Sequence, residues 1–313
     1  MEEGQEGEAD QAPTLPDHLL TALSATMGEE VVEADLVGVP QWQLGAKVDD
    51  RQRRLLEEGV GEEEVEVRAR LQSLTLPHAG DWLHAAPILA LGLHLQPLEF
   101  VLAASYRLGL PLYRVEGASP TCPACHQPAD IYGIHTMNCG TGGERIHRHT
   151  LLVDVVHQVA AAAQLAPRKE VRFLIPGRDS RPADVLLPQW SGGQDAALDI
   201  TVVNPCQAAF VVGAAATPGY ALEQAHRRKM RGAEEACRAQ GLNFLPLVAE
   251  SHGGWGEVAV AVVDRIARSL ARQTGQREED VTRQTWSRLA VTLQRANGQT
   301  LYFHVLPPYT MDL

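Results

Sequence analysis

Two aspartates stand beside a hairpin signal in the middle of the chain. Asp184 and Asp199 each interrupt a short apolar run, and Ser191-Gly192-Gly193 lies between the runs. Strand interiors disfavour aspartate, so two of them in neighbouring strands need a chemical reason. A hairpin centred between Ser191 and Gly192 sets the two aspartates directly opposite each other, with about 4.5–5.5 Å between their Cβ atoms.

Two carboxylates that close repel each other unless a cation lies between them. A hard ion such as Mg²⁺ is bound by one or two carboxylates together with water and phosphate oxygens. Such an ion generates hydroxide and stabilises the charge of phosphodiester hydrolysis. Thr201 follows Asp199 by two residues and is expected on the same face of the strand. The pair therefore predicts a Mg²⁺ site, and the alternative is a register shifted by one residue or acids at exposed strand ends.

A second group of residues has the spacing of a metal knuckle. The pattern C-x2-C-x9-H-x3-C offers four ligands, Cys122, Cys125, His135 and Cys139. Two thiolates on one tight turn hold Zn²⁺ at about 2.3 Å, and four nitrogen and sulfur ligands form a closed, structural tetrahedron. The segment has little apolar surface of its own, so bound Zn²⁺ is expected to supply its folding energy.

Other interpretations of this segment stay open. The first two cysteines are free thiols in a loop if His135 is incidental. Three neighbouring histidines are alternative ligands: His126, His147 and His149. The chain has five cysteines, an odd number, which favours metal ligation or burial over a disulfide framework.

A mixed α/β domain is expected to position both groups. The expected elements are a helix over 151–163, strands over 170–175, 182–187 and 196–203, a helix over 218–240, a strand over 242–248 and a helix over 257–272. This order predicts a small mixed sheet flanked by helices. Outside it we expect a helix that starts after Pro97 and ends near Gly109, and an amphipathic helix over 281–295.

The charge is uneven along the chain. The net charge of −12 belongs to residues 1–70, which hold 18 acidic and 6 basic residues, and the remainder holds 21 of each. The expected divisions are an acidic, largely disordered arm (1–70), a helical connector (71–117), the zinc knuckle (118–142), the α/β domain (143–272), and a C-terminal helix and tail (273–313). The first ten residues carry five acids and no base, and no apolar run reaches 18 residues, so we expect an intracellular protein without a membrane span.

The acid pair and the knuckle together resemble a nuclease family. Pro-Ala-Asp184, fourteen residues and then Asp199-Ile-Thr201 look like the PD-(D/E)XK signature. With the upstream CCHC knuckle and the segment Arg145-x-x-Arg-His149, they resemble the restriction-like endonuclease region at the C-terminal end of site-specific non-LTR retrotransposon proteins, whose core is similar to that of archaeal Holliday-junction resolvases. The resemblance covers about residues 71–270 and implies a restriction-endonuclease-like αβββαβ core. A Tyr/Phe-x-Asp-Asp polymerase motif is absent, so the chain is expected to be a fragment or a domesticated piece of such an element.

The resemblance implies roles for the residues of the signature. Asp184 and Asp199 hold Mg²⁺. The lysine that should follow the second acid by two residues is replaced by Thr201, and in the retrotransposon branch this lysine comes from the following helix. Lys229 is the matching residue, with a solvated helix face as the alternative.

A further acid is expected beside the pair. Glu170, at the start of the first strand, is favoured slightly over Glu144 at the start of the preceding helix. The residues expected to contact DNA are Arg145, Arg148, His149, Arg181, Arg227, Arg228 and Arg231.

The resulting hypothesis is a Mg²⁺-dependent DNA endonuclease that nicks its target and leaves a 5′-phosphate, in a nuclear protein without a small-molecule cofactor. The alternative is a catalytically inactive, zinc-stabilised module that binds nucleic acid or protein. The acidic arm favours this alternative, since it repels phosphate. A third hypothesis is a fragment without function.

Overall fold

The computed structural model describes residues 63–112, 120–171 and 183–305, together with Leu174 and some residues between 50 and 61. The chain divides into two units, Met1–Glu63 and Glu64–Leu313, and the elements below belong to the second unit. Its helices are α3 (Val65–Leu74), α4 (Asp81–His84), the short 3-10 helix η2 (Leu89–Leu91), α5 (Pro97–Leu108), α6 (Ile134–Asn138), α7 (Glu144–Ala162), α8 (Val211–Ala216), α9 (Tyr220–Arg238), α10 (Glu257–Thr274) and α11 (Glu278–Val305). Its strands are β1 (Arg168–Lys169), β2 (Val185–Ser191), β3 (Gln194–Val203) and β4 (Leu242–Glu250).

The strands form one mixed sheet in the order β1-β2-β3-β4. β1 pairs with β2, and β2 with β3, in antiparallel fashion. The second pair is antiparallel because a tight turn at Gly192-Gly193 joins β2 directly to β3. β3 and β4 are parallel, and α8 and α9 provide the crossover connection that a parallel pair needs. The sheet therefore has the expected mixed character.

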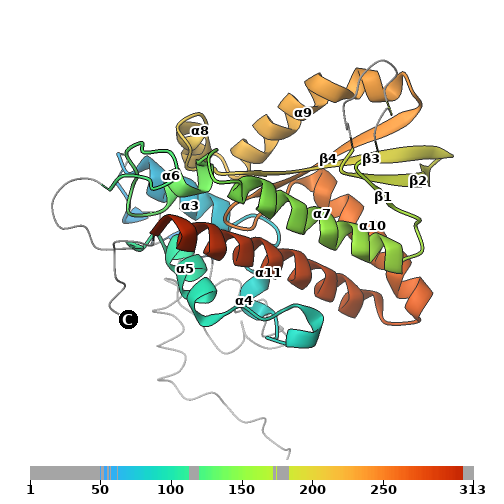
Figure 1. Ribbon diagram of the computed structural model, residues 1–313, viewed down its shortest axis with the longest axis horizontal. Coiled ribbons are helices and arrows are strands. Elements are labelled where there is room, and N and C mark those ends of the chain that lie inside the picture. The colour runs from blue at the N-terminus through green and yellow to red at the C-terminus, as the bar shows by residue number, and fades with distance from the viewer. Residues whose placement is uncertain are drawn as a thin grey trace, which may run out of the picture. The chain divides into compact units, whose positions relative to one another are not determined.

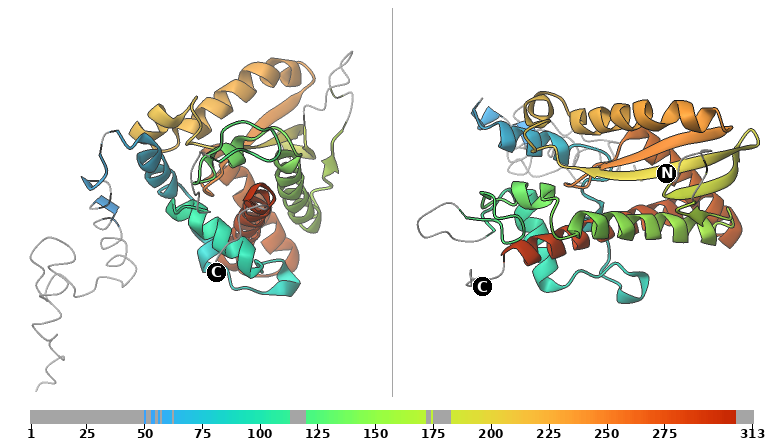
Figure 2. Two further views of the ribbon diagram at one scale, coloured as in Figure 1. Left: turned by 60° about the vertical axis from the view of Figure 1, so that its left-hand side comes forward. Right: turned by 45° about the horizontal axis from the view of Figure 1, so that its top comes forward.

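Helices cover both faces of the sheet, as Figure 1 shows. α9 lies on one face, while α7 and α10 lie on the other with α11 packed behind them (Figures 1 and 2). β3 supplies both faces by alternation: Leu198 and Ile200 join the core with α7 and α10, and Ala197 packs toward α9.

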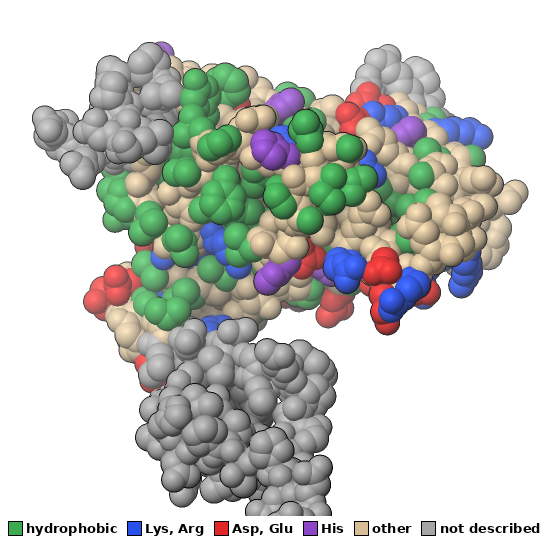
Figure 3. All heavy atoms as spheres, turned by 90° about the horizontal axis from the view of Figure 1, so that it is seen from below, with side chains coloured by type: hydrophobic (Ala, Val, Ile, Leu, Met, Phe, Trp, Pro, Cys, Tyr) green, Lys and Arg blue, Asp and Glu red, His purple; other side chains and the backbone are tan. Residues whose placement is uncertain are grey.

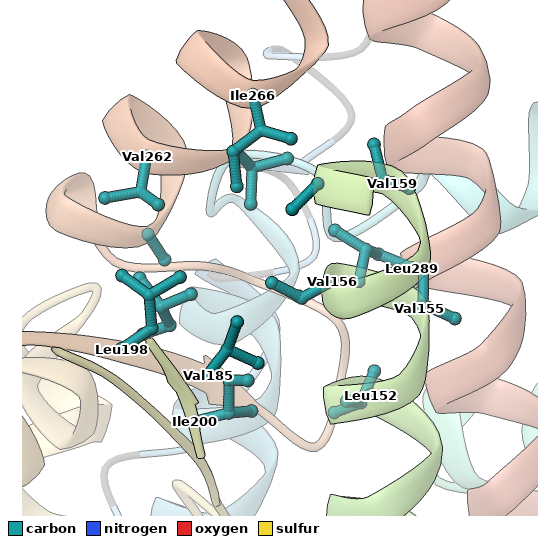
Figure 4. Close-up of a cluster of buried hydrophobic side chains, with 14 of the residues drawn as sticks. Leu152, Val155, Val156, Val159, Val185, Leu198, Ile200, Val262, Ile266 and Leu289 are labelled. Atoms are coloured by element: carbon teal, nitrogen blue, oxygen red, sulfur yellow. The ribbon is translucent and has the colours of Figure 1, made fainter. Parts of the chain in front are cut away.

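The larger core lies between the sheet and the three helices. Figure 4 shows side chains of α7, among them Leu152 and Val156, pointing toward Leu198 and Ile200 of β3 and toward Ile266 of α10. These residues are buried, and several have no exposed surface. Each such side chain contributes about 1.5–3 kcal/mol relative to an exposed position. This core fixes α7 and β3 relative to each other, and both elements carry residues of the candidate site.

α11 joins the α/β domain to the preceding helical segment. It contacts α5, α7 and α10, and Trp286 and Leu293 are fully buried along it. Toward its C-terminal end the buried Asn297 donates a hydrogen bond of 2.7 Å to the backbone oxygen of Ser251, just beyond β4. A buried amide needs such a partner, and this contact ties the end of α11 to the sheet.

The structure confirms the coarse fold and corrects several elements. The helices expected over 151–163, 218–240 and 257–272 are present as α7, α9 and α10. The hairpin around the acid pair is present as β2 and β3, and the strand expected over 242–248 is β4. The strand predicted over 170–175 does not begin at Glu170, because β1 ends at Lys169 and Glu170 has a φ of 46°, which is unfavourable in a strand. Residues 172, 173 and 175 of that prediction lie outside the described residues. The last helix is longer than expected and reaches Val305, and α8 was not predicted. Residues 1–70 were expected to be a largely disordered arm; residues 1–49 lie outside the described part of the chain, and α3 begins at Val65, within the predicted arm, and buries Ala69.

Exposed hydrophobic side chains gather between residues 83 and 110. They are Leu83, Ile88, Leu89, Leu91, Phe100, Leu108 and Leu110, on and around α4, η2 and α5. Figure 3 shows the molecule from below in the orientation of Figure 1, and on this face hydrophobic side chains are more numerous than charged ones. Of the helices in the described residues, none has the length and apolar character to cross a membrane.

Candidate functional site

The four residues of the knuckle pattern come together in space. Their ligand atoms, three sulfur atoms and one ring nitrogen, all lie within 4.8 Å of one another: Cys122, Cys125, His135 and Cys139. The distance between Cys122 Sγ and Cys139 Sγ is 3.9 Å, and that between Cys125 Sγ and His135 Nε2 is 3.3 Å. A tetrahedron with Zn–S bonds of about 2.3 Å and a Zn–N bond of about 2.0 Å has edges of about 3.8 and 3.5 Å. The group is therefore positioned to bind a metal ion, and its soft ligands suit zinc.

Local backbone contacts hold these ligands in place. The two cysteines of the first pair lie on a tight turn, in which His126 N–H donates to Cys122 O and Cys122 N–H to Gln127 O, both at 2.9 Å. The second pair is carried by α6, whose start is fixed by Asp130. Its carboxylate accepts hydrogen bonds from the backbone N–H groups of Ile134 and His135, at 3.0 and 2.6 Å. Asp130 thereby satisfies two of the free backbone N–H groups in the first turn of α6, whose N-cap residue is Gly133.

The open choice among the histidines is settled by the geometry. Of the four candidates, His135 lies in the cluster. His126 occupies the turn with a φ of 59° and is exposed. His147 is 3.3 Å from Gln299 Oε1, and His149 contacts Asp184. The cysteine thiols differ in environment: the backbone of Gln127 lowers the pKa of Cys125, and burial raises the pKa of Cys139 to about 11.

The acid pair lies where β2 and β3 diverge. The ladder pairs Val185 with Leu198, which is the register that the sequence predicts, and the next residues are Asp184 and Asp199. Asp184 was expected to interrupt a strand, but β2 begins at Val185, so Asp184 immediately precedes the strand. Its backbone N–H donates to Leu198 O at 2.8 Å, and its carboxylate Oδ2 accepts from Ile200 N–H at 2.6 Å. Asp184 thereby closes the ladder with its own side chain.

Each carboxylate has a basic partner from a different helix. Asp184 Oδ2 lies 3.0 Å from His149 Nε2 of α7, and Asp199 Oδ2 lies 2.7 Å from Lys229 Nζ of α9. The hydrogen bond to Asp184 raises the pKa of His149. Burial raises the pKa of Asp199 against the opposing effect of Lys229. Four elements thus bring two acids and two bases to one place, here called the acid–base group (Asp184, Asp199, His149 and Lys229).

A cleft of about 320 Å³ opens beside this group. Its lining residues come from the end of the knuckle, from α7 and from β3: Gly140, Arg145, Ile146, Arg148, His149, Thr201 and Val202. β3 continues beyond the start of β2, and within the described part of the chain no strand pairs with the outer edge of β3 past Leu198. Such an edge leaves backbone donors and acceptors open to a ligand.

The remaining candidates are placed as follows. Thr201 lines the cleft and Arg145 is exposed beside it. Arg148 is 4% exposed and its guanidinium donates to Asn297 Oδ1 at 3.1 Å and to Met137 O at 3.4 Å, so it lies inside the fold rather than on a phosphate-binding surface. Burial lowers the pKa of Arg148 to about 10.

Of the basic residues on α9, Arg227, Arg228 and Arg231 are exposed, and Arg227 pairs with Glu223 one turn away. Arg181 lies outside the described residues. The two candidates for the further acid lie in different surroundings. Glu170 is exposed and donates its backbone N–H to Asp184 O at 3.0 Å. Glu144 faces His304 instead, at 3.7 Å.

Sequence reasoning did not assign His149 to Asp184, although a signal existed. His149, Leu152 and Val156 recur at positions i, i+3 and i+7 of α7, so His149 continues the buried stripe of that helix. A histidine at the end of a buried stripe points toward the sheet. The contact of His304 with Cys122, 182 residues apart in the chain, had no comparable signal.

Comparison with known proteins adds no relative: no family model matches the chain, and no curated protein sequence matches it.

Proposed function

We propose that this protein is a Mg²⁺-dependent DNA endonuclease of the PD-(D/E)XK type, with a structural zinc site beside it. The single observation that carries the proposal is the meeting of Asp184, Asp199 and Lys229, which come from β2, β3 and α9. The resemblance in sequence requires a lysine displaced to this helix, and Lys229 Nζ lies 2.7 Å from Asp199 Oδ2.

The donor chemistry of the pair fits a hard cation. Asp184 and Asp199 offer carboxylate oxygens and no sulfur, and Mg²⁺ takes one or two carboxylates while it keeps waters and binds substrate phosphate. When bound, the ion would lower the pKa of a water and stabilise the charge of phosphodiester hydrolysis. Lys229 would contribute a fixed positive charge to the scissile phosphate. His149 would orient the Asp184 carboxylate through its 3.0 Å contact.

The cleft next to the group supports a nucleic acid as the substrate. It lies between the knuckle and β3, and Arg145 and Thr201 line it with groups that donate hydrogen bonds to phosphate oxygens. A DNA strand in this cleft would pass His149 and reach the acid pair. A nuclear location and a DNA partner follow from this proposal.

One observation favours the second candidate, an inactive zinc-stabilised binding module. Each acid already has a basic partner, so the acid–base group is neutral without a metal ion when His149 is protonated. Among the described residues, the cysteine cluster is the one group of three or more metal-ligand side chains whose ligand atoms lie within 4.8 Å.

The test is the cleavage of supercoiled plasmid by the zinc-loaded full chain. We expect nicking with added Mg²⁺ or Mn²⁺, none with Ca²⁺ or without a divalent ion, and product ends that carry a 5′-phosphate and can be sealed by a ligase. Chelators are left out because they also remove zinc. Asp199→Asn should lose at least about 100-fold in rate, and Asp280→Asn, a partly exposed residue of α11 far from the acid pair in sequence, should not. DNA binding without cleavage by a folded, zinc-loaded protein would favour the inactive module.

A further inference from the structure

The knuckle packs against α7 and α11 of the α/β domain. Met137 of α6 is buried against Leu301, in the last turns of α11. The buried Arg148 of α7 donates to Met137 O at 3.4 Å and to Asn297 Oδ1 of α11 at 3.1 Å. A side chain added at Gly133 would meet Leu301 Cδ2 at 2.7 Å, so the knuckle backbone lies directly on α11. The knuckle, the start of α7 and the end of α11 therefore meet at one place.

A histidine at this junction touches one of the candidate metal ligands. His304, in the last turn of α11, has 7% of its surface exposed. Its Nδ1 lies 3.3 Å from Cys122 Sγ. A metal-bound cysteine is a thiolate and accepts hydrogen bonds without donating any. The hydrogen in this contact is therefore assigned to His304 Nδ1.

The opposite edge of the same ring faces an acid. His304 Nε2 lies 3.7 Å from Glu144 Oε2, in the first turn of α7. Both atoms are buried, and neither has a hydrogen-bond partner in the described part of the chain. Buried polar atoms rarely lack partners, so a ring that lies between a sulfur ligand and a carboxylate has a specific role.

We propose that His304 and Glu144 form an outer layer of the zinc site. With hydrogens on both ring nitrogens, His304 donates from Nδ1 to the Cys122 thiolate and directs its Nε2–H toward the Glu144 carboxylate, which orients the ring. Residues that bond metal ligands in this way fix the ligand orientation and tune the affinity for the metal. The donated hydrogen bond reduces the negative charge on the sulfur, and a Cys3His site carries a net charge of −1 that this interaction offsets. His304 is a positioning residue and not a ligand, because it contacts Cys122 and lies outside the group of four.

The arrangement links zinc binding to the geometry of α7. Glu144 opens that helix, and His149, a little more than one turn further along, contacts Asp184. Zinc binding would hold the start of α7 through His304 and Glu144, and so hold His149 against the sheet. This inference rests on the zinc site of the proposed function and is independent of DNA cleavage.

The test measures zinc affinity in the full chain by competition with a chromogenic chelator. We expect His304→Ala to bind Zn²⁺ about 10–100-fold more weakly and Glu144→Gln to weaken binding in the same direction by less. His304→Asn should recover most of the affinity, because its amide nitrogen replaces Nδ1 as a donor. The matched control is His147→Ala, which removes a different contact between α7 and α11, that of His147 with Gln299, and should leave the affinity unchanged.

A second readout reports the sulfur ligand itself. In Co²⁺-substituted protein the thiolate-to-metal absorption band should shift in His304→Ala and stay in place in His147→Ala. Zinc affinity and absorption equal to the wild type in a folded His304→Ala variant would overturn the inference and leave the zinc site intact. A wild-type chain that binds no Zn²⁺ would overturn both, and a zinc-binding chain that does not cleave DNA would remove the nuclease alone.

Discussion

The cysteine cluster and the acid–base group are built in opposite ways. The cluster uses four residues within 18 positions of sequence, on a tight turn and a short helix that are fixed by local hydrogen bonds. The acid–base group takes one side chain each from α7, the start of β2, β3 and α9, over a span of about 80 residues. The first needs only local structure, and the second needs the whole fold.

The two groups also differ in what balances their charges. Three thiolates and a neutral imidazole include no positive charge, so the cluster needs a bound cation to be stable. The two aspartates are already paired with His149 and Lys229 at 3.0 and 2.7 Å. Metal should therefore be a condition of folding at the cluster and a condition of reaction at the acid–base group.

The largest expected effect comes from removing a ligand of the cluster. Cys122→Ala should abolish tight zinc binding, and residues 120–142 should lose their protection from hydrogen exchange, because structural zinc sites contribute on the order of 10 kcal/mol to the folding of such segments. The sheet and α9 should keep their protection. Cys237→Ala, a buried cysteine on α9 away from the cluster, is the control and should retain the metal. Zinc retained by the Cys122 variant would remove the contrast between the two groups.

The next largest effect is expected at Lys229. Lys229→Met leaves the buried Asp199 without its cation and should destabilise the fold by about 1–3 kcal/mol. It should also lower the rate of plasmid nicking by about 100-fold or more, because a fixed charge at a scissile phosphate contributes on that order. The exposed Arg228→Met on the same helix is the matched control for charge. Urea unfolding and single-turnover cleavage measure the two effects. An unchanged cleavage rate in a folded Lys229→Met chain would show that the lysine is structural.

The smallest effect is a pH dependence at His149. The hydrogen bond to Asp184 raises the pKa of His149 in the folded state. The resulting stabilisation is complete below the pKa of an unfolded histidine, about 6.5, and is lost as the pH rises through the folded value. Wild type should therefore exceed His149→Gln in unfolding free energy most at a pH just below about 6.5, and the gap should shrink as the pH rises above that value. A gap that grows with pH would contradict the pairing seen here.

Much of the fold follows from periodicity, and the failures have physical causes. Apolar spacing predicts α7, α9, α10 and the β2–β3 hairpin, because each of these elements buries one continuous face. The start of the strand predicted at 170–175 was wrong because Glu170 lies in the left-handed region of φ, which an apolar pattern does not reveal. The short α8 was missed because Val211–Ala216 is small and apolar without a helical period.

The site divides in the same way. The cysteine cluster was predictable from the spacing of its residues, although that spacing left the choice between His135 and three neighbouring histidines to the structure. The hairpin register near the acids was also predictable, since a strand has a period of two, although a bulge between Leu187 and Ser191 shifts the pairing near the turn. The contact of His149 was indicated by the buried stripe of α7 but not assigned to Asp184. The contact of His304 depends on how the end of α11 packs on the knuckle, which sequence patterns do not reveal.

The proposal that the cysteine cluster holds structural zinc and the acid pair holds catalytic Mg²⁺ is tested most directly on one variant, Asp184→Asn, with two readouts. The zinc content of the purified full chain and the Mg²⁺-dependent nicking of plasmid are measured on the same sample, beside wild type and Asp280→Asn. The account predicts one equivalent of zinc in all three proteins and nicking in wild type and Asp280→Asn alone. Nicking by Asp184→Asn at the wild-type rate, or loss of zinc from that variant, would contradict it.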